Sequence, residues 1–334
     1  MVHHMGVEDT EFDIHPMRRD EAAGVLRCLR DEYGDRYPHR IVYDTDRFYE
    51  ACRKGDTVSM VAADRDGEVA AHVALAGSVL LPGTMELCMG IVCKRYRNRS
   101  LMTLISERAF EHAIGNLHLM SVNSQPVTHH VYAQKVCAAQ GYHCCGFVFN
   151  IANEGLFDPR DKDQRGSIAL VVRMLKDQRR RIHVPAEVLP VVRRIVSDMR
   201  LEREFAVSGG AFPEGTSGIR SEIDDSLQFA DTAVRCIGED FEERLAREHE
   251  LFVLRGCKAS RLFLNICDHN APAAYDIAKR AGYFCTGMFP GSSDCDYLMM
   301  ENPMELPIEY DSLKIDERYA DIFALIRGLY PGSR

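Results

Sequence analysis

The amino-acid sequence predicts an α/β fold that consists of two similar repeats in tandem. Its 334 residues suffice for about two domains of roughly 150 residues each. Strand and helix patterns alternate along the chain, and the alternation starts again near residue 186. The sequence G-Y-H-C-C-G at 141–146 is matched by G-Y-F-C-T-G at 282–287. We therefore expect two units, each a mixed, mostly antiparallel sheet flanked by helices.

The first repeat is expected to cover residues 1–178. Asp66-Gly67 and Pro82-Gly83 are turn signals that separate three consecutive strand patterns, and the polar stretch 151–166 predicts a loop. In chain order, the patterns predict a strand at 11–17, helices at 20–33 and 46–54, strands at 57–64, 68–79 and 84–92, a helix at 100–115, a strand at 117–124, a helix at 130–140, and strands at 142–150 and 167–175.

The second repeat is expected to cover residues 179–334. It opens with the basic run Arg179-Arg180-Arg181, which we interpret as a solvated linker face. The patterns then predict a helix at 186–199, strands at 203–208, 218–223 and 227–237, a helix at 239–255, a strand at 260–266, a helix at 270–281, strands at 283–289 and 295–301, and a helix at 316–329.

Composition excludes several classes of partner. Lys plus Arg is 41 and Asp plus Glu is 50, a formal net charge of −9, which disfavours nucleic acid or an anionic membrane. No apolar run reaches the ~18 residues of a membrane span, and no signal-peptide core follows Met1, so we expect a cytoplasmic protein. The twelve cysteines are scattered without a C-x-x-C pair, which predicts reduced thiols and no metal site.

One strand-to-helix junction, between the strand at 84–92 and the helix at 100–115, contains the candidate functional residues. The strand at 84–92, the sequence V-C-K-R-Y-R-N-R-S-L at 92–101 and the helix at 100–115 resemble motif A of the GNAT superfamily, the acyl-CoA-dependent N-acetyltransferases. The helix at 130–140 with its Gly-Tyr end resembles the next motif of that family. The order of elements over 11–175 fits the family pattern, whereas the second repeat fits it only over about 227–301.

Anion binding at this junction can also be argued from physical chemistry, without the resemblance. A helix N-terminus leaves backbone N–H groups unpaired and carries partial positive charge, so a pyrophosphate can dock there. Arg97 and Arg99 would add charge-assisted hydrogen bonds to phosphate oxygens. The resemblance thus implies acetyl-CoA as co-substrate, held by Ile91, Val92, Cys93, Arg97, Asn98, Arg99, Ser100, Leu101 and Met102.

The junction departs from the family pattern at its glycine positions. Ser100 and Met102 stand where the motif has glycine, and Asn98 stands where a tandem branch of the family has one. Asn tolerates left-handed φ and Ser caps a helix, so the turn is expected to survive. The alternative is a charged surface turn with two solvated arginines.

The equivalent junction of the second repeat is C-I-G-E-D-F-E-E at 236–243. Its carboxylates would repel a pyrophosphate, so we expect no CoA there. The second repeat would then shape the substrate cleft or pack on the first as a pseudo-dimer.

Three residues are candidates for acid–base catalysis. Glu86, on the strand that leads into motif A, is the candidate base that draws a proton from the amine, and its alternative is an ordinary outward residue. His72 and His130 are further candidates, with a core role and a surface role as their alternatives; His129 shares the surface reading. Many family members have a tyrosine acid four residues before the Gly-Phe corner, where this chain has Cys137, which we read as a core residue.

These features together predict an N-acetyltransferase that moves an acetyl group from CoA to an amine of a small molecule or peptide. The alternative is a non-catalytic GNAT-like module that senses a ligand or binds a protein. No metal is expected. The chain is expected to be a monomer that contains its own pseudo-dimer, or a homodimer.

Overall fold

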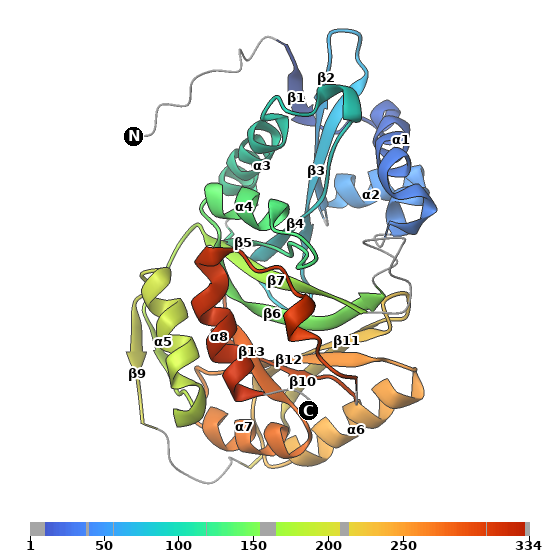
Figure 1. The fold of residues 1–334 in the computed structure, drawn as a ribbon. Helices are drawn as coiled ribbons and strands as arrows, with labels where there is room; N and C mark the ends of the chain where they lie inside the picture. Colours follow the sequence, from blue (N-terminus) through green and yellow to red (C-terminus); the bar gives the residue numbers. More distant parts are fainter. Residues whose placement is uncertain are drawn as a thin grey trace. The chain divides into compact units, whose positions relative to one another are not determined.

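The computed structural model of the chain describes residues 11–37, 40–55, 57–117, 119–153, 165–207, 214–304 and 306–330. These residues divide into two compact units (Figure 1). The first unit comprises the chain up to Ser78 together with Met85–Leu119, and the second comprises Val79–Thr84 and Met120–Arg334. The expected repeat boundary at 178/179 lies within the second compact unit, and the division into repeats 1–178 and 179–334 stays a prediction.

The first compact unit holds an antiparallel sheet between helices. Figure 1 shows α1 and α2 on one face and α3 on the other. Asp44 begins α2 by accepting the Arg47 N–H at 3.0 Å, and Gly55, with φ of 86°, ends it. The strands in sheet order are β1 (Asp13–Pro16), β2 (Thr57–Ala63), β3 (Val69–Gly77) and β4 (Thr84–Val92); the helices are α1 (Ala22–Tyr33), α2 (Thr45–Lys54) and α3 (Leu101–Leu117).

The second compact unit holds a larger sheet, with strand order β5-β7-β6-β13-β14-β12-β11-β10. Its neighbours are antiparallel except β11 and β12, which are parallel. The strands are β5 (Ser121–Ser124), β6 (His143–Asn153), β7 (Arg165–Met174), β10 (Gly218–Asp224), β11 (Phe229–Cys236), β12 (Ala259–Asn265), β13 (Phe284–Phe289) and β14 (Tyr297–Asn302). The helices are α4 (Tyr132–Ala139), α5 (Leu189–Asp198), α6 (Phe241–Leu254), α7 (Ala271–Arg280) and α8 (Ala320–Leu329).

The repeated motif meets itself at the middle of this sheet. Gly146 of β6 pairs with Gly287 of β13 in an antiparallel register, and the two residues are equivalent positions of the repeat. Their φ values are 149° and 147°, and a Cβ on either would lie 2.2 or 2.1 Å from the opposite backbone oxygen. Antiparallel pairing of equivalent residues is the geometry of a two-fold axis. The sequence repeat is therefore a structural repeat in this part of the chain.

The predicted fold class is confirmed, because the structure is a mixed, mostly antiparallel α/β arrangement and its elements follow the predicted order. One short element was not predicted. Arg180–Ile182 forms β8, which pairs in parallel with β9 (Arg203–Phe205) in a separate two-stranded sheet. The prediction of a solvated linker at 179–181 is wrong for Arg180, whose side chain is 9% exposed and donates to buried Asp296 at 2.8 Å.

Candidate functional site

The junction between β4 and α3 is a tight turn that contains two residues with a left-handed backbone conformation. A short turn at Lys94–Tyr96 follows the strand, and α3 begins at Leu101. Asn98 and Ser100 have left-handed φ values of 64° and 54°. These are positions where the family pattern has glycine, so the turn is made without it, as expected. Leu101 and Met102 form the first turn of α3, whose N–H groups have no intrahelical partner.

A tyrosine fixes this turn to the rest of the first unit. Tyr96 is 9% exposed, and its hydroxyl donates to Asp64 on the turn between β2 and β3. That hydrogen bond lowers the pKa of Asp64. Asp64 also accepts the N–H groups of Asp66 and Glu68, at 3.0 and 2.9 Å. The junction is therefore braced against the predicted hairpin.

A disulfide corrects the prediction about the cysteines. Cys93, the first residue after β4, is bonded to Cys28 of α1. The other ten cysteines are free thiols. Sequence spacing gave no signal for this pair, since 65 residues separate its members. The bond ties the start of the junction to α1.

Both candidate arginines have carboxylate partners. Arg97 donates from Nη2 to Glu32 at 2.7 Å and from Nε to the Val92 carbonyl at 3.2 Å. Arg99 donates to Glu11. Their side chains are 42% and 43% exposed, so they are neither freely solvated nor buried. A phosphate at this junction would have to share or replace these carboxylates.

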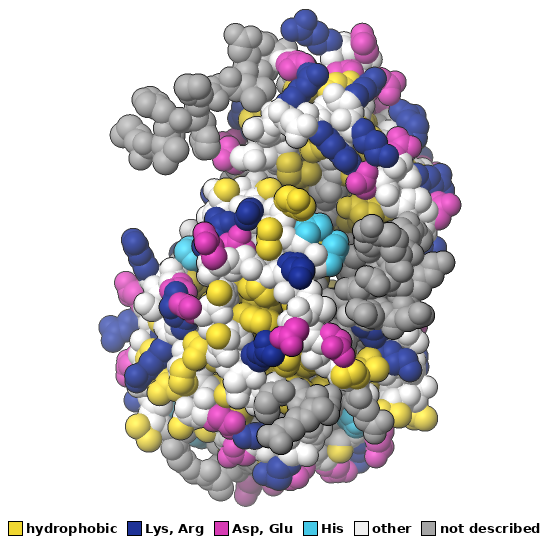
Figure 2. Space-filling model, in the orientation of Figure 1, with side chains coloured by type: hydrophobic (Ala, Val, Ile, Leu, Met, Phe, Trp, Pro, Cys, Tyr) yellow, Lys and Arg dark blue, Asp and Glu magenta, His cyan; other side chains and the backbone are white. Residues whose placement is uncertain are grey.

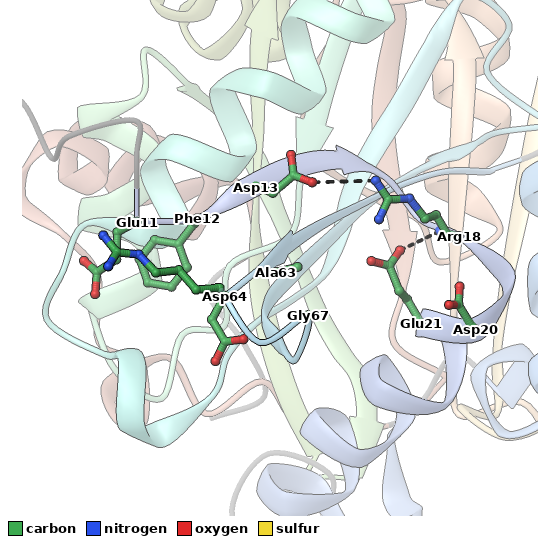
Figure 3. Close-up of a pocket in the computed structure, with 10 residues that line it drawn as sticks. Glu11, Phe12, Asp13, Arg18, Asp20, Glu21, Ala63, Asp64 and Gly67 are labelled. Atoms are coloured by element: carbon green, nitrogen blue, oxygen red, sulfur yellow. Dashed lines mark hydrogen bonds and ion pairs between the residues drawn. The ribbon is translucent and has the colours of Figure 1, made fainter.

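A cavity beside the junction has the wrong charge for a phosphate. Its volume is about 540 Å³. Five carboxylates line it against two arginines, so negative charge predominates: Glu11, Asp13, Asp20, Glu21 and Asp64 against Arg18 and Arg65. Figure 3 shows the Arg18 guanidinium paired with Asp13, which offsets part of this charge, while the Arg18 backbone N–H donates to Glu21. Five carboxylates would repel a pyrophosphate. The cavity is therefore not the cofactor site.

His72 is a core residue. It is fully buried in β3, and burial lowers its pKa from 6.5 to about 4. Its Nδ1 lies 3.0 Å from the Met89 carbonyl, which can only accept, and its Nε2 lies 2.6 Å from Ser59 Oγ. Of its two alternative roles, the geometry supports the structural one.

Glu86 lies at a half-buried position of β4, opposite Ala76 of β3. Alternation along the strand places it on the same face as Cys88. Burial and then the charge of Glu86 raise the pKa of Cys88 well above its usual value. Sequence reasoning missed a third group here: Tyr37, between α1 and α2, accepts a hydrogen bond from the Met89 N–H.

His130 belongs to the second compact unit, whereas Glu86 and His72 belong to the first. The His130 ring lies 4.3 Å from the His129 ring, and its Nδ1 is buried without a hydrogen-bond partner among the described residues. Cys137, at the family's tyrosine position, is 7% exposed, and burial raises its pKa to about 11. It has the core role that the sequence predicted.

The equivalent junction of the second repeat is closed by its own side chains. The Ile237 N–H donates to Asp268 at 3.1 Å, and the Gly238 N–H donates to Ser217 Oγ at 2.9 Å. Asp240 accepts the Ser217 N–H at 2.6 Å. A Cβ on Gly238 would lie 2.3 Å from the carbonyl oxygen of residue 215. The N–H groups of Ile237 and Gly238, which precede α6, are therefore occupied, whereas the side chain of Asp240 makes no capping hydrogen bond to α6 itself.

No group of three or more His, Cys, Asp or Glu side chains within the described ranges could hold a metal ion. Among the same residues, no helix is long and apolar enough to cross a bilayer. Positive and negative side chains are interspersed over the face drawn in Figure 2.

No family model matches the sequence, and no curated protein is significantly similar to it. Solved structures are similar to about half of the chain. An N-acetyltransferase from Staphylococcus aureus Mu50 is 12% identical, with 50% of this chain and 100% of that chain covered and a TM-score of 0.43. A ribosomal-protein-S5-alanine acetyltransferase from Vibrio fischeri is 10% identical, with 50% of this chain and 94% of that chain covered and a TM-score of 0.42. A spermidine N-acetyltransferase mutant from Vibrio cholerae is 8% identical, with 50% of this chain and 95% of that chain covered and a TM-score of 0.41. All three of these solved structures are acetyltransferases by their descriptions.

Proposed function

We propose that the chain is an N-acetyltransferase that transfers an acetyl group from acetyl-CoA to an amine of a small molecule or peptide. The observation that carries the proposal is the junction between β4 and α3. Two left-handed residues, Asn98 and Ser100, open a 17-residue helix beside Arg97 and Arg99. The pyrophosphate of CoA would bind there, where N–H groups and guanidinium charge converge.

The chemistry would take place on β4. An ammonium must lose a proton before its nitrogen can attack a thioester, and Glu86 would accept that proton. A backbone N–H at the end of the strand would stabilise negative charge on the carbonyl oxygen. The Cys93 N–H already donates to Ala70 at 3.0 Å. Successive N–H groups of a strand point to opposite sides, so the Val92 N–H is the better donor.

Calorimetry with acetyl-CoA and a broad amine panel test the proposal. We expect one CoA per chain, because the second junction is closed, and acetylation of at least one amine. Two CoA per chain would show that the second junction opens in solution. No CoA binding, in buffers with and without reductant, would remove the function altogether.

The two ion pairs of the arginines favour a second candidate, a non-catalytic module that senses a ligand or binds a protein. Glu32 and Glu11 hold the groups that would bind phosphate, and Cys137 cannot act as a tyrosine acid. CoA binding without acetylation of any amine would support this candidate. The cytoplasmic location, and the choice between monomer and homodimer, stay predictions.

A further inference from the structure

β10 (Gly218–Asp224) is an edge strand, whereas the equivalent strand of the first repeat is covered. β3 and β10 are each the antiparallel neighbour of a strand that leads into a junction, β4 or β11. β3 pairs with β2 along its other edge. β10 is the last strand of its sheet, and no described strand pairs with its outer edge. About half of the N–H and C=O groups of an antiparallel strand point to each side, so β10 presents a row of them at this edge.

Two charged side chains of β10 have no partner of opposite charge among the described residues. Arg220 and Glu222 are both exposed, and they lie on one face of the strand because they are two residues apart. Glu222 stands opposite Asp231 of β11, and Arg261 donates to Asp231 at 2.7 and 3.0 Å. Glu222 is therefore left beside a like charge, which is unfavourable for paired strands. A cation on the outer side of Glu222 would offset this repulsion.

The sequence of β10 is self-complementary about Ser221. Residues 219–223 read I-R-S-E-I. When two copies of the strand lie antiparallel with Ser221 opposite Ser221, each Arg220 faces a Glu222, and the isoleucines at the two ends face each other. A slip of two residues places Arg220 opposite Arg220 or Glu222 opposite Glu222, and a slip of one residue sets the charged face against the apolar face. The charges therefore favour a single register.

The helix over this edge has an exposed apolar side chain. Arg244 of α6 donates to the Ser217 carbonyl, just before β10. Arg255, the residue after α6, donates to Asp225, just after β10, at 2.6 and 2.7 Å. Leu251 is seven residues after Arg244 and four before Arg255, so helical periodicity places it on the same flank of α6, towards β10. Leu251 is 43% exposed, and a second α6 beside this one would cover it.

We propose that β10 binds β10 of a second copy of this chain, so that the two sheets continue into one another across a two-fold axis. The second copy takes the place on β10 that β2 has on β3. Backbone hydrogen bonds and two Arg220–Glu222 pairs hold the strands together. On the other face, Ile223, which packs against Phe252 of α6, and Leu251 are covered by the second copy. None of these residues belongs to the candidate acetyl-transfer site, so the inference does not depend on the proposed function.

Analytical ultracentrifugation of the full chain tests the proposal through charge reversal. We expect the wild-type chain at micromolar concentration to have twice the mass of one chain. Arg220→Glu sets two pairs of like charge across the axis, and so does Glu222→Arg, so each should raise the Kd of the dimer about 10-fold or more. Arg53→Glu, which reverses an exposed arginine of α2, should leave this Kd unchanged. The thermal midpoint checks that each variant is folded.

A mixture of the two single variants distinguishes this interface from any other surface. Arg220→Glu and Glu222→Arg chains carry opposite charges at both facing positions, so they should dimerise with each other with a Kd near that of the wild type. The doubly reversed chain Arg220→Glu/Glu222→Arg should dimerise with itself. A monomeric wild-type chain, a dimer that neither reversal weakens, or single variants that do not pair with each other would each overturn the proposal. Failure of acetyl transfer would leave all these masses unchanged, so the two proposals fail separately.

Discussion

The two strand-to-helix junctions of this chain differ in the side chains that surround their backbone N–H groups. At the second, Ser217 and Asp268 satisfy the N–H groups of Gly238 and Ile237, and Asp240 adds negative charge. At the first, Asn98 and Ser100 have left-handed φ values, no acidic residue lies in the first turn of α3, and Arg97 and Arg99 pair with Glu32 and Glu11. We therefore expect an anion to bind at the first junction, which we call open, rather than at the second, which we call closed and where Asp240 and Asp268 add negative charge.

The strand that leads into the second junction is β11. It pairs in parallel with β12 from Phe229–Ala259 to Val234–Leu264. A few side chains that satisfy backbone N–H groups from within can remove an anion site while the sheet and helices remain. We expect this at the second junction.

The largest expected effect concerns Glu86, in the repeat with the open junction. Glu86→Gln keeps the shape and removes the proton acceptor, so the rate should fall about 10²-fold or more. CoA affinity should hardly change, and raising the pH should restore part of the rate, because more amine is then neutral. Glu222→Gln, on a strand of the second repeat, is the matched control. Wild-type turnover in Glu86→Gln at neutral pH would make Glu86 an ordinary surface residue.

Acid should destabilise the first unit through His72. Its pKa falls from 6.5 to about 4 on folding, so the unfolded chain takes up the proton first. The stability is complete above about pH 6.5 and is lost as pH falls towards 4. At about 1.4 kcal/mol for each pH step, the loss approaches about 3 kcal/mol. Urea unfolding from pH 7 to 4 should show this slope, and His72→Gln should flatten it.

In the second unit, Glu301 should give the opposite pH dependence of stability: acid should stabilise the unit at this residue. This carboxyl is fully buried, and burial raises its pKa well above the usual value. Its contribution is therefore present at low pH and is lost as pH rises through the folded pKa. Amide exchange at pH 5 should show β3 losing protection relative to β14. Equal changes in the two strands would contradict the assignment to these two groups.

The arginines of the open junction should contribute about 2 kcal/mol to CoA binding. Arg97→Ala/Arg99→Ala removes two charge-assisted donors, so the Kd should rise about 30-fold. Arg247→Ala, on the helix after the closed junction, removes an exposed arginine that pairs with Glu243 and should have no effect. Calorimetry measures both variants. An unchanged Kd in the double variant would exclude this junction as the cofactor site.

Local patterns predicted most of the fold, because alternation and helical periodicity are properties of neighbouring residues. They also predicted that Asn98 and Ser100 could form the turn, since both residue types tolerate the backbone that it needs. The Cys28–Cys93 bond, the Arg97–Glu32 pair and the Tyr37–Met89 hydrogen bond could not be predicted. Each joins groups more than fifty residues apart in the sequence, and only the packing of α1 and its following loop on β4 brings them together.

The smallest expected effect tests whether the Arg97–Glu32 ion pair lowers the affinity of the open junction for CoA. Both side chains are partly exposed, so the pair is worth about 0.2–1 kcal/mol. Glu32→Gln removes the competing carboxylate, leaves Arg97 its bond to the Val92 carbonyl, and should tighten CoA binding by about two- to fivefold. Glu50→Gln, which breaks the exposed pair with Arg53 on α2, should leave the Kd unchanged. The gain should shrink as salt is added, because screening weakens the attraction to phosphate. Weaker binding in Glu32→Gln would instead mean that Glu32 orients Arg97 towards the phosphate, so that the ion pair belongs to the site rather than competing with it.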